Sequence, residues 1–396
     1  MKKYFSLAGL VLTLLVANIT GGAAETLKDV FKDDFLVGAA INRDQIFGED
    51  ARGDAIIRAQ FNSISPENIL KWQHVHPLPG EYAFEAPDRY VQFGESNGMF
   101  VVGHTLVWHS QTPEWVFQDE KGRPLKRDAL LARMRDHIST VMGRYKGRIK
   151  GWDVVNEAVA ENGRLRQTPW LKIIGEDYLV KAYQFAHTAD PQAELYYNDY
   201  GLENPTKRAG AVALVKKLQA AGVKISAVGI QGHYQLDPTS PTVQEVDDTI
   251  TAFARLGVKV SITELDVDVL PSAWASLSAD VSRREKSEAR LNPYTKGLPS
   301  EVQMQLAARY AELFTVFLKH RDDLERVTFW GVTDADSWLN DWPVAGRRSY
   351  PLLFDLEGKS KLAFDAVVKI KKAALPAASK QFGKDQLETS VLHTGL

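Results

Sequence analysis

The stretch IKGWDVVNEA, residues 149–158, is an apolar run that ends abruptly in two polar residues. Ile149–Val155 lacks the strict polar alternation of a half-exposed strand, which is typical of a strand buried on both faces. Asn156 and Glu157 follow at once. Seven similar runs lie along the chain, and the eight together are Phe35–Ile41, Ser63–Pro66, Phe100–Leu106, Ile149–Val155, Glu194–Asn198, Ala227–Gln231, Val258–Thr263 and Val327–Val332.

Helical patterns separate these runs. Leu130–Tyr145, Asp177–Ala189 and Val302–Leu318 carry apolar residues at helical spacing, and Pro205–Ala221 stops before Gly222. A strand followed by a helix, repeated eight times, predicts a (β/α)8 barrel of the α/β class. Such a barrel takes up most of a 396-residue chain as one domain.

Both ends of the chain differ from its middle. Lys2, Lys3 and the apolar run Phe5–Val16, too short to span a bilayer, predict a signal peptide over residues 1–24 with cleavage near Ala24. An uncleaved anchor is the alternative. The barrel is assigned to residues 25–372 and a polar tail to residues 373–396. We therefore expect an exported protein, periplasmic or secreted, with no membrane segment in its mature form.

Composition excludes several classes of function. The net charge is −2 and no charged block occurs, so nucleic acid is not expected as a partner. The absence of cysteine excludes disulfides, thiolate metal sites and a cysteine nucleophile. Asp266–Asp268 and Asp334–Asp336 do not continue into a calcium loop, and no phosphate loop or GxSxG elbow is present. We expect no metal and no cofactor.

The strand-like runs end in residues that suit a cleft better than a core. In a barrel, the carboxyl ends of the strands converge on one mouth, where catalysis takes place. The residues at or just after these ends are Glu67, Asn68, Lys71, His104, Trp108, Asn156, Glu157, Gln231, His233, Glu264, Asp266, Trp330 and Trp338.

Two carboxylates, Glu157 and Glu264, are the decisive pair because strands four and seven face each other across the mouth. Cleavage of a glycosidic bond needs one carboxylic acid to protonate the leaving oxygen and a second carboxylate beneath the anomeric carbon. If the two carboxyl groups lie about 5–5.5 Å apart, the second attacks directly and configuration is retained. Two ordinary loop glutamates are the alternative.

Beyond this chemistry, the motifs resemble one family. WDVVNEA (Trp152–Ala158) and ITELD (Ile262–Asp266) are similar to the two catalytic signatures of glycoside hydrolase family 10, the β-1,4-xylanases. The resemblance covers Leu36 to Ile370. Further stretches match other family blocks in the family's order, namely SPENILKW (Ser65–Trp72), GHTLVWHSQTPEW (Gly103–Trp115), YYNDYGLE (Tyr196–Glu203), GIQGHY (Gly229–Tyr234) and WGVTDADSW (Trp330–Trp338).

The resemblance implies a role for each residue of the catalytic pair and its neighbours. Glu157 matches the acid/base, which must start protonated, and Glu264 the nucleophile, which must be ionised. Asn156 matches a residue that bonds the sugar 2-hydroxyl. His233 matches the partner of the nucleophile, and Asp266 can hold that histidine charged and oriented.

For other matching residues, a purely structural role is the alternative. Gln231 is a candidate for tuning the acid/base, but Gln231, His233 and Asp266 also fit a satisfied buried polar cluster. Glu67, Asn68 and Lys71 match glycone-side sugar contacts, although residues four apart are more often a helix-surface pair.

The remaining matches supply a histidine and three aromatic walls. His104 matches a residue that bonds a hydroxyl of the sugar at the scissile bond, and Trp108, Trp330 and Trp338 match walls of the cleft. Core packing is the alternative for any single tryptophan. Xylose lacks the hydroxymethyl group of glucose, so Trp330 and Trp338 are candidates for rejecting glucan by clash.

Two features depart from the family pattern. Leu339 stands where many relatives carry a basic residue, which puts one glycone-side contact in doubt. The segment Pro271–Pro299 is a long polar insertion that either reshapes one end of the cleft or is a tolerated surface elaboration.

Taken together, the sequence predicts a retaining endo-β-1,4-xylanase that acts as a monomer on xylan and xylo-oligosaccharides. A barrel glycosidase for glucan or mannan is the alternative within enzymes. A carbohydrate-binding protein without activity is the alternative from another class.

Overall fold

The computed structural model describes residues 25–272, 284–286 and 288–374. The predicted signal peptide and the predicted tail from residue 375 onward lie outside the described residues. The strands are β1 (Leu36–Ile41), β2 (Ser63–Pro66), β3 (Phe100–Val107), β4 (Gly151–Asn156), β5 (Glu194–Asp199), β6 (Ala227–Ile230), β7 (His233–Gln235), β8 (Lys259–Asp268) and β9 (Leu324–Phe329).

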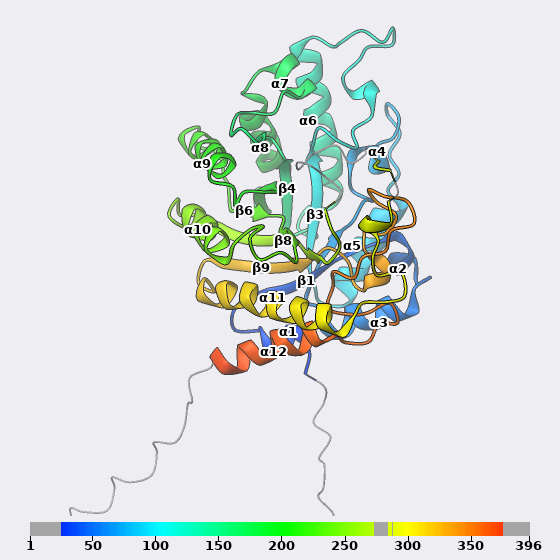
Figure 1. The fold of residues 1–396 in the computed structure, drawn as a ribbon. Helices are drawn as coiled ribbons and strands as arrows, with labels where there is room; N and C mark the ends of the chain where they lie inside the picture. Colours follow the sequence, from blue (N-terminus) through cyan, green and yellow to red (C-terminus); the bar gives the residue numbers. More distant parts are fainter. Residues whose placement is uncertain (1–24, 273–283, 287, 375–396) are drawn as a thin grey trace, which may run out of the picture.

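The strands close into a parallel barrel with helices on the outside (Figure 1). Each of β1 to β5 pairs in parallel with its successor, β6 pairs with β8, β8 with β9, and β9 returns to β1. Closure leaves no free edge on the strands of the barrel ring, β1 to β6, β8 and β9, and buries both of their faces, which is why these runs are apolar without alternation. The predicted (β/α)8 fold is confirmed.

Several helices begin at side chains that cap their first turn. Asn204 caps the first turn of α9 and Pro205 occupies its first position. Thr242 and Glu245 form a capping box at the start of α10. The helices are α1 (Leu27–Val30), α2 (Arg43–Phe47), α3 (Ala51–Gln60), α4 (Trp72–Val75), α5 (Glu85–Ser96), α6 (Arg127–Arg144), α7 (Pro169–Ile174), α8 (Tyr178–Ala189), α9 (Pro205–Ala220), α10 (Val243–Ala254), α11 (Ser300–Lys319) and α12 (Leu362–Ala374).

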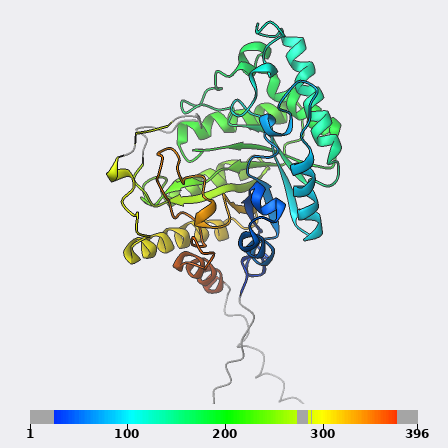
Figure 2. The ribbon, with the colours of Figure 1, turned by 90° about the vertical axis from the view of Figure 1, so that its right-hand side faces the viewer.

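The first and last helices close the same side of the molecule. α1 and α12 pack together, and α12 lies along α11, as Figure 1 and the turned view in Figure 2 both show. No helix within the described ranges is long and apolar enough to cross a bilayer.

Two strands differ from the predicted runs by three or more residues at an end. β8 continues through Glu264 to Asp268, five residues beyond the predicted end, because the short strand β7 pairs with its far half. β9 ends at Phe329, so Trp330 opens a loop instead of lying within the strand. Register shifts interrupt β3 after His104, β4 after Asp153 and β8 after Ile262. Such bulges redirect side chains beside active sites.

The described part of the insertion packs beside the cleft-forming segment after β9. Glu285 forms a β-bridge with Val344. Asn292 donates from Nδ2 to the carbonyl oxygen of Gly346 over 2.9 Å. Residues 273–283 and 287 lie outside the described part.

At the amino ends of the strands, glycines make room for large side chains inside the barrel. A Cβ placed on Gly151 would lie 2.1 Å from the Tyr196 hydroxyl oxygen, and Tyr196 is fully buried beside Arg326. No such collision is tolerable in a core packed at crystal-like density.

We predict that Gly151→Ala lowers the free energy of unfolding by about 1–3 kcal/mol, because the added methyl overpacks the barrel interior. The measurement is the midpoint of denaturant unfolding. The matched control is Gly143→Ala in α6, where no atom lies within 4 Å of the new Cβ; a helical glycine replaced by alanine should gain about 0.5–1 kcal/mol. Equal midpoints for the two variants would contradict the packing described.

Candidate active site

The two predicted carboxylates come from the carboxyl ends of β4 and β8 and are buried. Glu157 directly follows β4 and has a left-handed backbone, with φ of 56°. Glu264 lies within β8, just past the register shift after Ile262, and its backbone N–H donates to the carbonyl of Gln231 over 2.7 Å. Both side chains are almost fully enclosed, with Glu157 at 6 % exposure and Glu264 at 5 %.

A buried asparagine from β5 connects the surroundings of the two glutamates. Asn198 donates from Nδ2 to Glu264 Oε1 over 2.8 Å and to Asn156 Oδ1 over 3.0 Å. Its Oδ1 accepts the hydroxyl of Thr263 over 2.6 Å. Since Asn156 Nδ2 also lies 3.5 Å from Glu157 Oε1, the two carboxyl groups belong to one hydrogen-bonded cluster.

Both oxygens of Glu157 have a neutral donor. Gln231 donates from Nε2 to Oε1 over 3.0 Å, and the indole N–H of Trp108 donates to Oε2 over 2.9 Å. Trp108 is itself buried. Neutral donors and an indole wall fix the carboxyl group in place without adding a charge of either sign.

Glu264 faces a cation instead. His233 Nε2 lies 3.2 Å from Glu264 Oε2, and its Nδ1 lies 3.0 Å from Asp266 Oδ1. Burial opposes protonation of the ring, but Asp266 and Glu264 outweigh it and raise the pKa of His233 to about 10. Burial would likewise raise the pKa of Glu264, yet the His233 contact, the nearby His104 and the Asn198 amide together lower it. Glu264 is therefore an anion at neutral pH.

The aromatic side chains lie against this charged group. Trp338 donates from its indole nitrogen to Asp266 Oδ2 over 2.7 Å, and its ring centre is 4.9 Å from that of His233. Trp342, which the sequence reading did not single out, stacks on Trp338 at 4.5 Å. Trp330 makes edge contacts with His104 and His233. The walls thus touch the polar residues that they were predicted to flank.

The three polar residues just after β2 form their own chain of hydrogen bonds. Lys71 Nζ donates to Asn68 Oδ1 over 2.9 Å, and Asn68 Nδ2 donates to Glu67 Oε1 over 3.1 Å. The Lys71 ammonium lies 5.3 Å from the ring centre of Trp108. Burial raises the pKa of Glu67 and lowers that of Lys71. Glu67 and Lys71 precede α4, so the helix-surface alternative is wrong.

Comparison with known proteins gives the family. The profile of glycosyl hydrolase family 10 matches residues 26–370. The chain belongs to glycosyl hydrolase family 10. It is 45 % identical over 345 residues to endo-1,4-beta-xylanase A of Xylanibacter ruminicola, covering 87 % of this chain and 93 % of that protein. It is 42 % identical over 378 residues to a beta-1,4-xylanase of Dictyoglomus thermophilum, covering 93 % and 99 %.

Solved structures agree with the family assignment. A family 10 endoxylanase retrieved from a sugarcane soil metagenome has a TM-score of 0.84 and 46 % identity, covering 87 % of this chain and 99 % of that one. Xylanase XynB from Paenibacillus barcinonensis, solved with a conduramine derivative, has a TM-score of 0.78 and 37 % identity, covering 87 % and 98 %.

Two buried residues of this family 10 protein were missed in the sequence. Asn198 lies near the end of β5, and a search of the last residues of every strand would have found it, because it stands where Asn156 stands on β4. Asp153 lies within β4 and its Oδ2 is 2.9 Å from His104 Nδ1, which orients that ring. Only the fold brings Asp153 to His104, so no sequence signal marks it.

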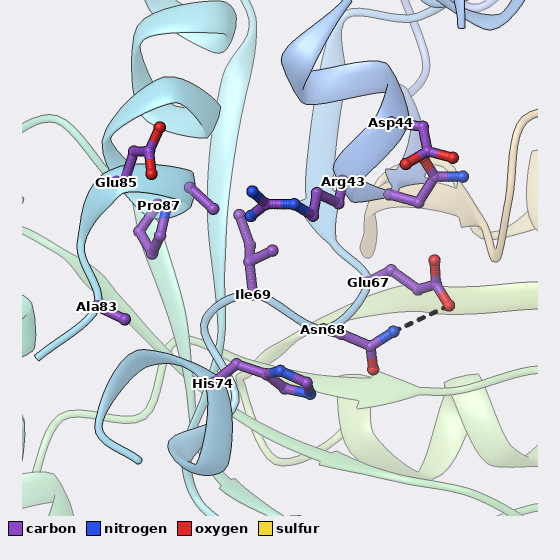
Figure 3. A pocket seen from close by; sticks show the side chains of 11 residues that line it. Arg43, Asp44, Glu67, Asn68, Ile69, His74, Ala83, Glu85 and Pro87 are labelled. Carbon is purple, nitrogen blue, oxygen red and sulfur yellow. Dashed lines mark hydrogen bonds between the residues drawn. The ribbon is translucent and has the colours of Figure 1, made fainter. Parts of the chain in front are cut away.

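A pocket of roughly 460 Å³ adjoins Glu67 and Asn68 on the side of α2 and α5. Figure 3 shows the Arg43 side chain reaching into it from α2, toward Pro87 and above Ile69. The Arg43 guanidinium lies 4.1 Å from the ring centre of Phe47, and its N–H groups have no acceptor among the described residues. The pocket therefore presents free hydrogen-bond donors next to the predicted glycone contacts.

Two further observations concern the surroundings of the site. Leu339 is buried and offers no polar group. Within residues 25–272, 284–286 and 288–374, no three His, Asp or Glu side chains are grouped so as to hold a metal ion.

We predict that His233 stays protonated at neutral pH and that Asp266→Asn reverses this by lowering its pKa. The pKa of His233 in the folded protein, about 10, exceeds the unfolded value of about 6.5, so protonation of this ring stabilises the fold. The stabilisation from this cation is complete below pH about 6.5 and is lost as the pH rises through 10.

The measurement is NMR of ring-labelled histidine from pH 5 to 10, with His233→Asn to assign the signal. The wild-type ring should remain cationic to pH about 9, and the Asp266→Asn ring should titrate at lower pH. A wild-type His233 that titrates near 6.5 would contradict the ion-pair geometry.

Proposed function

We propose that the chain is a retaining endo-1,4-β-xylanase with Glu264 as nucleophile and Glu157 as acid/base. The observation that carries the proposal is the contrast between the two carboxyl groups. Glu264 is held as an anion by His233, whereas the Glu157 carboxyl group accepts hydrogen bonds only from the neutral donors Trp108, Gln231 and Asn156. One fixed anion and one carboxyl group that is hydrogen-bonded only by neutral donors suit the pair that double displacement requires.

In the first step, the Glu264 carboxylate attacks the anomeric carbon of the sugar. The bond from that carbon to the glycosidic oxygen breaks, and Glu157 gives its proton to the departing oxygen. Asn156, next to Glu157 and held by Asn198, is proposed to bond the sugar 2-hydroxyl as positive charge develops on the ring.

In the second step, Glu157 acts as a base. It takes a proton from a water molecule, whose oxygen attacks the anomeric carbon and displaces Glu264. The enzyme returns to its starting protonation state, and two inversions leave the configuration unchanged. No cofactor takes part in either step.

The substrate is proposed from the relatives and from the walls. The curated relatives named above are called xylanases, and Trp330 and Trp338 enclose the charged centre through contacts with His233. A hydroxymethyl group on the sugar would have to enter this aromatic enclosure. Glu67, Asn68, Lys71 and His104 are proposed to bond xylosyl hydroxyls.

Cleavage of internal bonds is proposed because a pocket lies beside Glu67 and Asn68. The pocket at Arg43 is lined in part by Glu67 and Asn68, and we propose that it accepts further sugar units of a longer chain. We also propose that residues 1–24 direct export and that the mature enzyme works as a monomer, which size-exclusion chromatography with light scattering tests directly.

We predict that Glu264→Gln lowers kcat on aryl xylobioside by at least about 10⁴-fold while leaving the fold intact, because the amide cannot form the glycosyl ester. Circular dichroism checks the fold.

Glu325→Gln is the matched control for that substitution. Glu325 is a part-buried carboxyl group near the start of β9, at the opposite end of the barrel, and burial raises its pKa to about 7. The control should retain full activity. Comparable loss in both variants, or residual activity in Glu264→Gln near that of the wild type, would reject the assignment.

We predict that Glu157→Ala slows substrates with poor leaving groups most, by about 10²–10⁴-fold, because they depend on proton donation. Added azide should raise its turnover of dinitrophenyl xylobioside and yield a β-xylobiosyl azide, since an anion needs no base. Absence of both the leaving-group dependence and the azide product would remove Glu157 from the acid/base role.

We predict that aryl xylobioside is turned over at least about 100-fold more efficiently than the matching aryl cellobioside, because the hydroxymethyl groups meet the tryptophan walls. Trp338→Ala should lower the ratio of xylobioside turnover to cellobioside turnover. Equal turnover by the wild type would favour the glucan alternative.

A further inference from the structure

A small hairpin comes after β4 and begins at the acid/base position itself. Ala160 N–H donates to the Arg164 carbonyl over 2.8 Å, and Arg166 N–H donates to the Ala158 carbonyl over 2.8 Å. Gly163, with φ of 75°, lies in the turn. The returning arm of the hairpin therefore brings Arg166 back alongside Glu157, nine residues earlier in the chain.

The backbone of Glu157 is held in a conformation that non-glycine residues disfavour. A left-handed φ costs about 1–2 kcal/mol and persists only where neighbours enforce it. Two hydrogen bonds do so here. The Glu157 N–H donates to the Asn198 carbonyl over 2.9 Å, and the Glu157 carbonyl accepts Arg166 Nε over 3.0 Å. The first comes from the barrel and the second from the hairpin.

The Nη2 atom of Arg166 makes further contacts in the same region. It donates to the Val159 carbonyl over 3.1 Å and to the Tyr200 hydroxyl over 3.0 Å, and lies 3.5 Å from Glu161. The Tyr200 hydroxyl donates to Glu161 in turn. A planar fork can reach these acceptors together, which a lysine ammonium on its flexible stem cannot do from one position.

Tyr200 connects this cluster to the barrel mouth. It directly follows β5, its ring is part-exposed, and the ammonium of Lys207 lies 3.3 Å from its ring centre. Lys207 in turn pairs with the buried Asp199 over 3.0 Å. Arg166 is thus the only described side chain that donates to both the Glu157 carbonyl and the Tyr200 hydroxyl.

We propose that Arg166 is a positioning residue for the acid/base, which fixes the strained Glu157 backbone against Tyr200 so that the carboxyl group meets the leaving oxygen. The proposal rests on the proposed function, because it takes Glu157 as the proton donor. Arg166 touches neither the reacting atoms nor the Glu157 carboxyl group; it acts through the main chain.

A purely structural role for Arg166 makes a different prediction from a positioning role. Loss of folded enzyme lowers kcat/KM equally for all substrates. A misplaced acid lowers kcat/KM only where the leaving group needs a proton, since kcat/KM reports the first displacement. The slope of log kcat/KM against leaving-group pKa therefore separates the two.

The test is that slope for a series of aryl xylobiosides in Arg166→Met, with the protein otherwise intact. We expect about a 100-fold loss for phenyl xylobioside and less than about threefold for the 2,4-dinitrophenyl compound, because a displacement of about 1 Å costs this much in a positioned proton transfer. Arg166→Lys should lie between wild type and Arg166→Met. Tyr200→Phe should steepen the slope in the same direction.

Arg164→Met is the matched control, an exposed arginine of the same hairpin, and should keep the wild-type slope. Equal losses for all leaving groups in Arg166→Met and Arg166→Lys would overturn the proposal. If Arg166→Met does not fold, the Arg166→Lys and Tyr200→Phe slopes decide. If Glu157→Ala itself shows no leaving-group dependence, the acid/base assignment fails; if it does and Arg166→Lys does not, only the Arg166 proposal fails.

Discussion

One buried amide, that of Asn198, fixes the positions of both glutamates relative to each other. Its nitrogen bonds Glu264 of β8 and Asn156 of β4, and its oxygen bonds Thr263. Gly229 on β6 leaves the space it needs, because a Cβ there would lie 2.3 Å from Asn198 Oδ1. With these polar groups buried, a shift of Asn198 would leave atoms unpaired at a cost of about 1–3 kcal/mol each.

From this fixed point, the two carboxyl groups acquire different environments. Protonated His233 is the charged neighbour of Glu264, and Asp266 keeps this histidine protonated. Trp338 packs on His233 and donates a hydrogen bond to Asp266. The Glu157 carboxyl group accepts hydrogen bonds only from neutral donors, and the Glu157 backbone is held in a left-handed conformation. The two glutamates thus differ in role because they lie on different strands and contact different neighbouring side chains.

The fold and the location of the candidate site could be predicted from the sequence because both depend on local patterns. Apolar runs without alternation marked the barrel strands, and polar residues after them marked the mouth. What the sequence did not predict depended on contacts between distant segments. β8 extends beyond its predicted end because β7 pairs with it, and Asp153 of β4 contacts His104 on the neighbouring strand β3. Arg166 reaches Glu157 only through a hairpin whose closure no periodicity reveals.

The central claim is that Glu264 bonds covalently to the sugar while Glu157 protonates the departing oxygen. Incubation with a 2-deoxy-2-fluoroxylobiosyl fluoride, then mass spectrometry of the digested protein, tests it most directly, because the fluorine slows breakdown of the intermediate. The account predicts one fluoroxylobiosyl group per chain, esterified to Glu264. A label on any other residue, or none together with a first product of inverted configuration, would contradict it.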